Sequence, residues 1–234
     1  MYSPALAVAT AGFELGAAAW VLRGQGRRPV LFVTTALLLF LAAYQIVEAT
    51  LCSIAPGSSF LPRLAFMVVT WLPPLGVLLV SFLLGAGAGV ARGFAAAMLT
   101  CAVVIQFWIG FDPSFARLSV CEAVYARYSH PTPGFLAYSG FYWTGLLGLV
   151  VFSGYGAARP RDPHNGRLAR LVLTGSLAFL GPAVITAQLL PASDGALPSV
   201  MCHFAVILAA FLVRLAHLEQ GFAADLQRET PVPI

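Results

Sequence analysis

The stretch LAAYQIVEATLC, residues 41–52, places side chains that can bind or transfer protons within an otherwise apolar run. Tyr44, Glu48 and Cys52 recur every four residues and Gln45 precedes Glu48 by three, so in a helix they share one face. A carboxylate in hydrocarbon is costly and normally faces a bundle interior or a water-filled cavity. This face therefore predicts part of a water-accessible pocket that is open to the outside.

Other polar side chains fall at the same expected depth near one membrane surface. At 1.5 Å per helical residue, Glu48 lies ~5 Å and His203 ~6 Å below that surface. The predicted ligand pocket consists of Tyr44, Gln45, Glu48, Gln106, Tyr142, Gln188 and His203. The alternative interpretation is that Glu48 reaches the headgroups or pairs structurally with His203 or Arg63.

A second carboxylate, Glu14, lies ~15 Å deep in the first apolar run. Gly12, Gly16 and several alanines flank it, and small residues let a neighbouring helix approach closely. At this depth the carboxyl group is expected to be protonated or hydrogen-bonded across helices. A structural role is favoured over a proton-relay role.

Motifs for catalysis or metal binding do not stand out in this sequence. It contains no HExxH, CxxC or GxSxG pattern, and no two histidines fall in facing apolar runs. All 13 basic residues are arginine, which excludes a retinal Schiff base because that linkage needs a lysine. We therefore assign no catalytic residue, no metal and no cofactor, and an enzyme is the least supported class.

The elements that position these residues are apolar runs long enough to cross a membrane. The chain has 234 residues, of which 59% are hydrophobic and 9% charged, whereas soluble domains carry roughly 25% charged residues. A run of about 20 apolar residues spans the hydrocarbon layer. The predicted fold is an all-α bundle of seven transmembrane helices, near 4–22, 29–51, 64–84, 93–111, 135–154, 168–190 and 199–213. Residues 1–217 then form one domain, and 218–234 form a short, frayed cytoplasmic tail.

Arginine placement predicts the orientation of the bundle. Ten arginines follow the odd-numbered runs and three follow the even-numbered runs. The positive-inside rule therefore puts the N-terminus outside and the C-terminus in the cytoplasm, in a bacterial inner (plasma) membrane. Expected partners are membrane lipids, a small-molecule ligand, and a larger membrane complex or a second copy of the chain. The net charge of +4 records topology and implies no nucleic acid.

Cysteines, prolines and one long loop give further expectations. Cys52, Cys121 and Cys202 map to the outer side, where a disulfide can persist. Cys52–Cys121 is the first choice and Cys52–Cys202 the second. SVCEAVYARY, residues 119–128, is expected to form a short amphipathic helix on the membrane surface. The third run is expected to break at Pro73 and Pro74, and the sixth to bend at Pro182.

Three segments together carry a resemblance to a family. YQIVEATLC, RLAFMVVTWLPPLGVLLV and PSVMCHFA resemble the corresponding helices of small seven-helix bacterial membrane proteins of unknown function. One such family opens with Met-Cys-Phe-Ser, whereas this chain opens MYSP, so a disulfide using that cysteine cannot form here. The resemblance implies the fold and topology but no activity.

Three functional classes remain open on the sequence. The first is binding or sensing of a small molecule or lipid headgroup, with Glu48 and His203 as anchors. The second is a small proton-coupled transporter that uses Glu14, although the chain lacks the internal repeats typical of transporters. The third is an accessory subunit of a larger membrane complex.

Overall fold

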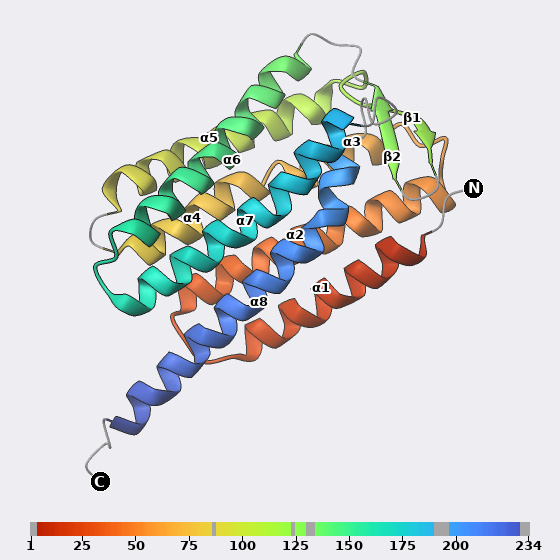
Figure 1. Cartoon of the computed structure of the whole chain (residues 1–234). Coiled ribbons are helices and arrows are strands. Elements are labelled where there is room, and N and C mark those ends of the chain that lie inside the picture. Colours follow the sequence, from red (N-terminus) through yellow and green to blue (C-terminus); the bar gives the residue numbers. More distant parts are fainter. Residues whose placement is uncertain (1–3, 86–87, 123–124, 130–133, 190–196, 230–234) are drawn as a thin grey trace.

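The computed structural model describes residues 4–85, 88–122, 125–129, 134–189 and 197–229. Seven helical spans in this part are long and apolar enough to cross a membrane, which confirms the predicted multi-pass bundle. The helices run side by side, and a small β-hairpin covers one end of the bundle (Figure 1). We call this the hairpin end. The opposite end, which carries the connections around Arg27 and Arg159, is the arginine-rich end.

The first helices set the centre of the bundle. Helix α1 (Ala5–Arg23) packs along α2 (Arg28–Ser53), which also contacts α3 (Leu61–Val69) and α4 (Leu72–Leu84). Helix α2 is the most buried of the seven spans. Its polar side chains are therefore directed into protein rather than lipid.

The remaining helices complete the bundle around α2. Helix α5 (Gly89–Phe111) is the least buried span and packs on α4. Helix α6 (Phe135–Ala158) lies between α4 and α7 (Pro163–Leu189), and α8 (Leu197–Glu229) packs on α7, α2 and α1. Short connections join α1 to α2 and α6 to α7, as expected for neighbouring helices in a bundle.

The third span is broken where the prolines predict it. Helix α3 ends at Val69 and α4 begins at Leu72, and together they count as one span, Leu61–Leu84. Pro73 and Pro74 have no N–H to continue the helical ladder. The backbone N–H of Trp71 donates to the Val68 carbonyl at 3.4 Å. Pro182, by contrast, lies inside the continuous helix α7.

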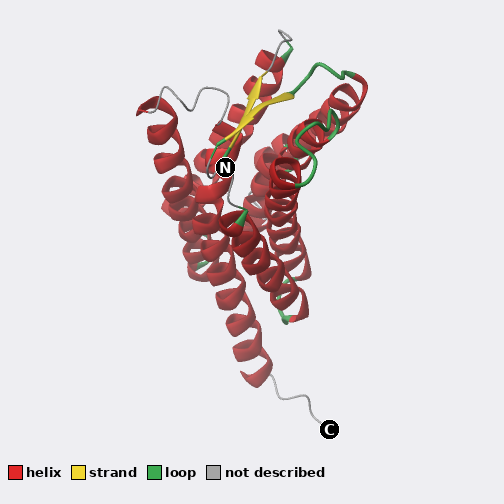
Figure 2. Cartoon of the chain, turned by 90° about the vertical axis from the view of Figure 1, so that its right-hand side faces the viewer, coloured by secondary structure: helices red, strands yellow, loops and turns green. Residues whose placement is uncertain are grey.

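The expected amphipathic helix at residues 119–128 is wrong, because this segment forms two strands. Strand β1 (Arg117–Cys121) pairs antiparallel with β2 (Ala126–Ser129), with an irregularity between Leu118 and Val120 (Figure 2). Ala126 and Tyr128 are buried while their neighbours are more exposed, a period of two that suits a strand and not a helix.

The C-terminal helix is longer than expected. We expected a frayed end from residue 218, but α8 continues to Glu229 and Glu219 is buried. Leu212, Leu215, Ala216 and Glu219 lie on one buried face, at helical spacing. Residues after Glu229 lie outside the described part of the chain.

Candidate functional site

The polar face of α2 is buried completely at the hairpin end. Tyr44 and Glu48 are 0% exposed and Gln45 is 1% exposed. Glu48 thus does not reach lipid or headgroups, which removes that part of the alternative interpretation. Arg63, the other suggested partner, directs its guanidinium to the carbonyls of Ser59 and Gly110, at 3.2 and 2.9 Å.

A disulfide closes the hairpin over this face. Cys52, one helical turn after Glu48, is bonded to Cys121 of β1, with 5.7 Å between the Cα atoms. This is the first of the two predicted pairings, and it occupies the cysteine that the Cys52–Cys202 alternative requires. The hairpin is also fixed to α8, because the backbone N–H of Ala126 donates to the Ser199 hydroxyl at 3.1 Å.

Aromatic side chains fill the space between the hairpin and the helices. Phe66 of α3 meets four rings edge-on, with centroids 5.4–5.8 Å apart: Phe115, Tyr128, Phe135 and Tyr138. Edge-to-face pairs add specific stabilisation to apolar burial. Tyr142 stacks on Tyr138 at 6.1 Å, which places this predicted pocket residue against the aromatic cluster.

The loop that leads into the hairpin begins with a local carboxylate turn. The hydroxyl and backbone N–H of Ser114 donate to Asp112 Oδ1 at 2.6 and 2.9 Å. These hydrogen bonds, with smaller contributions from the charges of Arg63 and Arg117, lower the pKa of Asp112. The turn orients the chain so that Phe115 enters the aromatic cluster.

His203 lies one turn into α8 with one ring nitrogen fixed. Its Nδ1 is 2.8 Å from the Ser199 carbonyl oxygen, which can only accept, so Nδ1 carries the proton. In the neutral ring Nε2 is then an acceptor, and this atom is buried without a hydrogen-bond partner among the described residues. Ser199 thus holds both the hairpin, through its hydroxyl, and this imidazole, through its carbonyl.

Gln106, another residue of the predicted pocket, contacts the backbone of the third span. Its Nε2 donates to the Met67 carbonyl at 2.6 Å. That carbonyl is the one an unbroken helix would pair with the N–H of Trp71, which turns to Val68 instead. Gln106 therefore satisfies the acceptor that the break in the third span leaves open.

Two residues of the earlier predictions cannot be placed. The side chains of Gln188 and Cys202 lie outside the described part, although both residues belong to helices. Of the predicted pocket, the structure brings Tyr44, Gln45 and Glu48 together on one buried face and puts Tyr142 and His203 at the same end. In the described ranges no three His, Cys, Asp or Glu side chains gather to form a metal site.

Glu14 lies apart from this set, midway along α1. It is 0% exposed, and within the described chain neither carboxylate oxygen has a hydrogen-bond partner. Helix α1 packs on α2 and α8, and Trp20 stacks on His217 one and a half turns further along α1. Burial of a carboxyl group without hydrogen bonds is costly.

Sequence reasoning missed a charged cluster at the arginine-rich end. Arg27 donates to Glu219 from Nε at 2.6 Å and from a terminal nitrogen at 2.7 Å, and its backbone N–H donates at 3.0 Å. His164 Nε2 lies 3.1 Å from Glu219 Oε2, and its ring stacks on Phe222 at 4.1 Å. The signal was available: Glu219 continues the buried spacing of Leu212 and Leu215.

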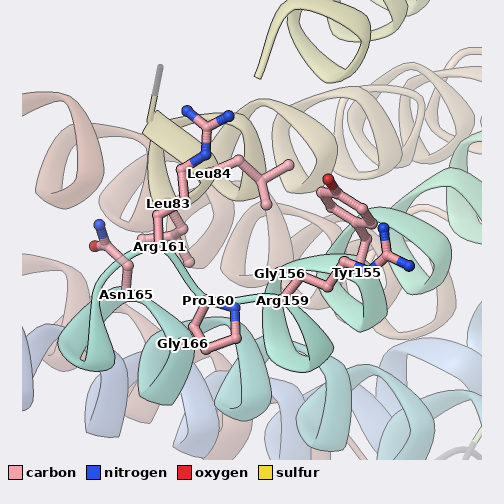
Figure 3. A pocket seen from close by; sticks show the side chains of 9 residues that line it. All are labelled: Leu83, Leu84, Tyr155, Gly156, Arg159, Pro160, Arg161, Asn165 and Gly166. Carbon is pink, nitrogen blue, oxygen red and sulfur yellow. The ribbon is translucent and has the colours of Figure 1, made fainter. Parts of the chain in front are cut away.

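Two cavities lie at the arginine-rich end, away from the predicted pocket. The larger, about 490 Å³, lies between the α1–α2 connection and the end of α8, beside Gly24, Arg28 and Gln227. The smaller, about 30 Å³, lies where α4, α6 and α7 meet (Figure 3).

Compared with models of known protein families and with curated protein sequences, the chain matches none.

Proposed function

We propose that this membrane protein binds a small polar molecule or a lipid headgroup at its hairpin end. The observation that carries the proposal is the complete burial of Tyr44, Gln45 and Glu48 on one face of α2. Burying a carboxylate in a membrane protein is costly, and intramembrane ionisable residues are functional candidates by default. The disulfide and the Ser199 contact keep the hairpin fixed over this face.

The chemistry of these groups indicates the class of ligand. His203 offers the buried acceptor Nε2, which has no hydrogen-bond partner among the described residues. The buried face of α2 at the same end carries the Glu48 carboxylate and the Gln45 amide. A ligand that matches this set presents several N–H or O–H donors, as an amine or a polyol does.

The test is a ligand screen by thermal unfolding of the purified full-length protein. Polyamines, amino sugars and polyols are compared, and a saturating ligand at 100 times Kd stabilises by about 2.7 kcal/mol. Glu48→Gln and His203→Phe should lose this stabilisation, while Cys101→Ser, on the exposed face of α5, should keep it. Equal stabilisation of Glu48→Gln, or no active compound for the native protein, contradicts the proposal.

The hairpin end is proposed to face the outside of a bacterial inner membrane, with the N-terminus outside and the C-terminus in the cytoplasm. Two observations support this: ten of the 13 arginines belong to the opposite end, and the disulfide lies at this one. Disulfides persist in oxidising compartments outside the cytoplasm. Labelling of Ser58→Cys by a membrane-impermeant maleimide in intact cells, without labelling of Gln25→Cys, is the expected result. The reverse pattern contradicts it.

A second candidate is proton-coupled transport through Glu14. The observation that favours it is a buried carboxyl group without a hydrogen-bond partner among the described residues. Such a group can take up and release a proton if a conformational change admits water. In proteoliposomes with an imposed pH gradient, Glu14→Gln should abolish proton movement while the unfolding temperature stays unchanged. Equal proton movement in the variant contradicts this candidate.

A further inference from the structure

The smaller cavity lies at the ends of three membrane spans. Helix α4 ends at Leu84, α6 ends at Ala158 and α7 begins at Pro163, and the cavity lies between these ends (Figure 3). Residues at the end of a span lie at the depth of lipid headgroups. A group bound in this cavity is therefore at the height of a lipid phosphate.

The charged residues that line the cavity are both cationic. Arg159 and Arg161 line it, and neither forms an ion pair with a carboxylate in the described part of the chain. No acidic residue is part of the lining. The guanidinium group binds phosphate oxygens through paired N–H donors, so two arginines without carboxylate partners match a phosphate group.

The remaining polar lining fits the substituents of such a phosphate. Tyr155 offers a hydroxyl group, and Asn165 Oδ1 is buried without a hydrogen-bond partner among the residues described. A headgroup hydroxyl can donate to that oxygen. At about 30 Å³, roughly the space of two to three waters, the cavity admits only a small group.

An apolar stripe on α6 leads away from this cavity. Trp143, Leu147, Val151 and Tyr155 follow each other at intervals of four residues, and each is between 39% and 64% exposed. Residues at this spacing lie on one helical face. The stripe runs from the cavity along the span, as an acyl chain attached to a bound phosphate would.

Close packing builds the floor of the cavity. A Cβ atom on Gly156 would lie 2.9 Å from Leu84 Cδ2 and 3.0 Å from Ala169 Cβ. Only glycine lets α4, α6 and α7 approach this closely. The part of the cavity next to Gly156 is therefore formed by closely packed helices.

We propose that this cavity binds the phosphate of an anionic phospholipid with a hydroxylated headgroup, whose acyl chain lies on the stripe of α6. This site is separate from the proposed ligand site at the hairpin end. Either proposal can fail without the other.

The test measures lipid binding to the purified full-length protein by native mass spectrometry. The Kd of phosphatidylglycerol should be about tenfold higher for the Arg159→Gln/Arg161→Gln variant than for the native protein. The control, Arg23→Gln/Arg167→Gln, removes the same charge from exposed positions that do not line the cavity and should retain the affinity. Equal weakening by both pairs would show a diffuse basic surface and overturn the proposal.

Two further comparisons separate a lipid from a free phosphate. Leu147→Ser/Val151→Ser, in the stripe of α6, should weaken phosphatidylglycerol binding several-fold. The control, Val103→Ser/Val104→Ser, changes two residues of α5 that are also exposed and should leave the binding unchanged. Inorganic phosphate should not displace the lipid at millimolar concentration, and displacement by it would overturn the lipid assignment. Because all eight substituted positions are exposed, unfolding temperatures without lipid should match the native protein. A lowered value for the Arg159→Gln/Arg161→Gln variant would assign those two residues to folding instead.

Discussion

The two ends of the bundle are held together by different means. At the hairpin end a disulfide, edge-to-face rings and the Ser199 hydroxyl join segments from α2, α3 and α8. At the arginine-rich end one buried carboxylate, Glu219, binds Arg27, which precedes α2, and His164, near the start of α7. The hairpin end is thus joined by a covalent bond and by ring contacts, whereas the arginine-rich end is joined by a buried charge.

The largest effect should come from breaking the covalent contact at the hairpin end. Replacing Cys52 and Cys121 with Ser opens a link across 69 residues, which the chain-entropy model values at about 4 kcal/mol. The measured loss should be smaller, because membrane helices stay inserted on unfolding. Chemical unfolding in detergent checks this, with Cys101→Ser as the control. A loss equal to that of the control would show that the rings alone hold this end.

The next effect concerns the arginine-rich end. Glu219→Gln breaks the ion pair with Arg27. The side chain of Glu219 is 1% exposed and that of Arg27 is 38% exposed. Breaking a buried pair costs 3–5 kcal/mol, and the exposed arginine reduces this to about 2 kcal/mol. Asp225→Asn, from an exposed pair at 3.9 Å, is the matched control and should change stability by less than about 0.5 kcal/mol. Similar values for both variants would contradict the structural role of Glu219.

A smaller effect is expected at the break in the third span. Gln106→Leu leaves the Met67 carbonyl without its donor, at a cost of about 1 kcal/mol. Thr100→Val on the same helix removes only a hydroxyl that bonds within α5, and it should cost less. If Gln106→Leu instead abolished ligand binding without loss of stability, Gln106 would belong to the binding site after all.

The smallest effect is local and depends on pH. The folded-state pKa of Asp112 lies below its unfolded value. The contribution of Asp112 to the stability of the turn is therefore complete above the unfolded-state pKa and is lost as the pH falls through the folded-state pKa. Hydrogen exchange at the Ser114 amide should therefore accelerate in acid relative to the general trend. Asp112→Asn should remove this acceleration, and an unchanged profile would contradict the assignment.

The spans and the first-choice disulfide follow from local sequence. Runs of about 20 apolar residues identify a membrane helix almost irrespective of context. Cys52 lies at the end of the second span and Cys121 follows the fourth, so topology alone brings both to the same end of the bundle. The helix break was predictable for the same reason, because proline acts on its own turn.

The errors concern contacts between segments distant in the chain. Glu219 is 192 residues from Arg27, so the spacing of Glu219 after Leu212 and Leu215 indicates burial but does not identify its partner. The hairpin depends on Phe66, which offers a ring surface to Tyr128 and so favours a strand with one buried face. Gln106 donates to the carbonyl of Met67, 39 residues earlier in the chain. That carbonyl lacks its helical donor because the third span is broken beside its prolines.

The cross-link between residues 52 and 121 also bears on how the protein is made. In the proposed orientation the first two outer cysteines are translated well before the third, which follows 81 residues after Cys121. At about 5–20 residues per second the ribosome needs roughly 4–16 s to cover that distance. During this interval Cys52 has a single available thiol partner. The order of synthesis therefore selects the native pair before the competing cysteine emerges.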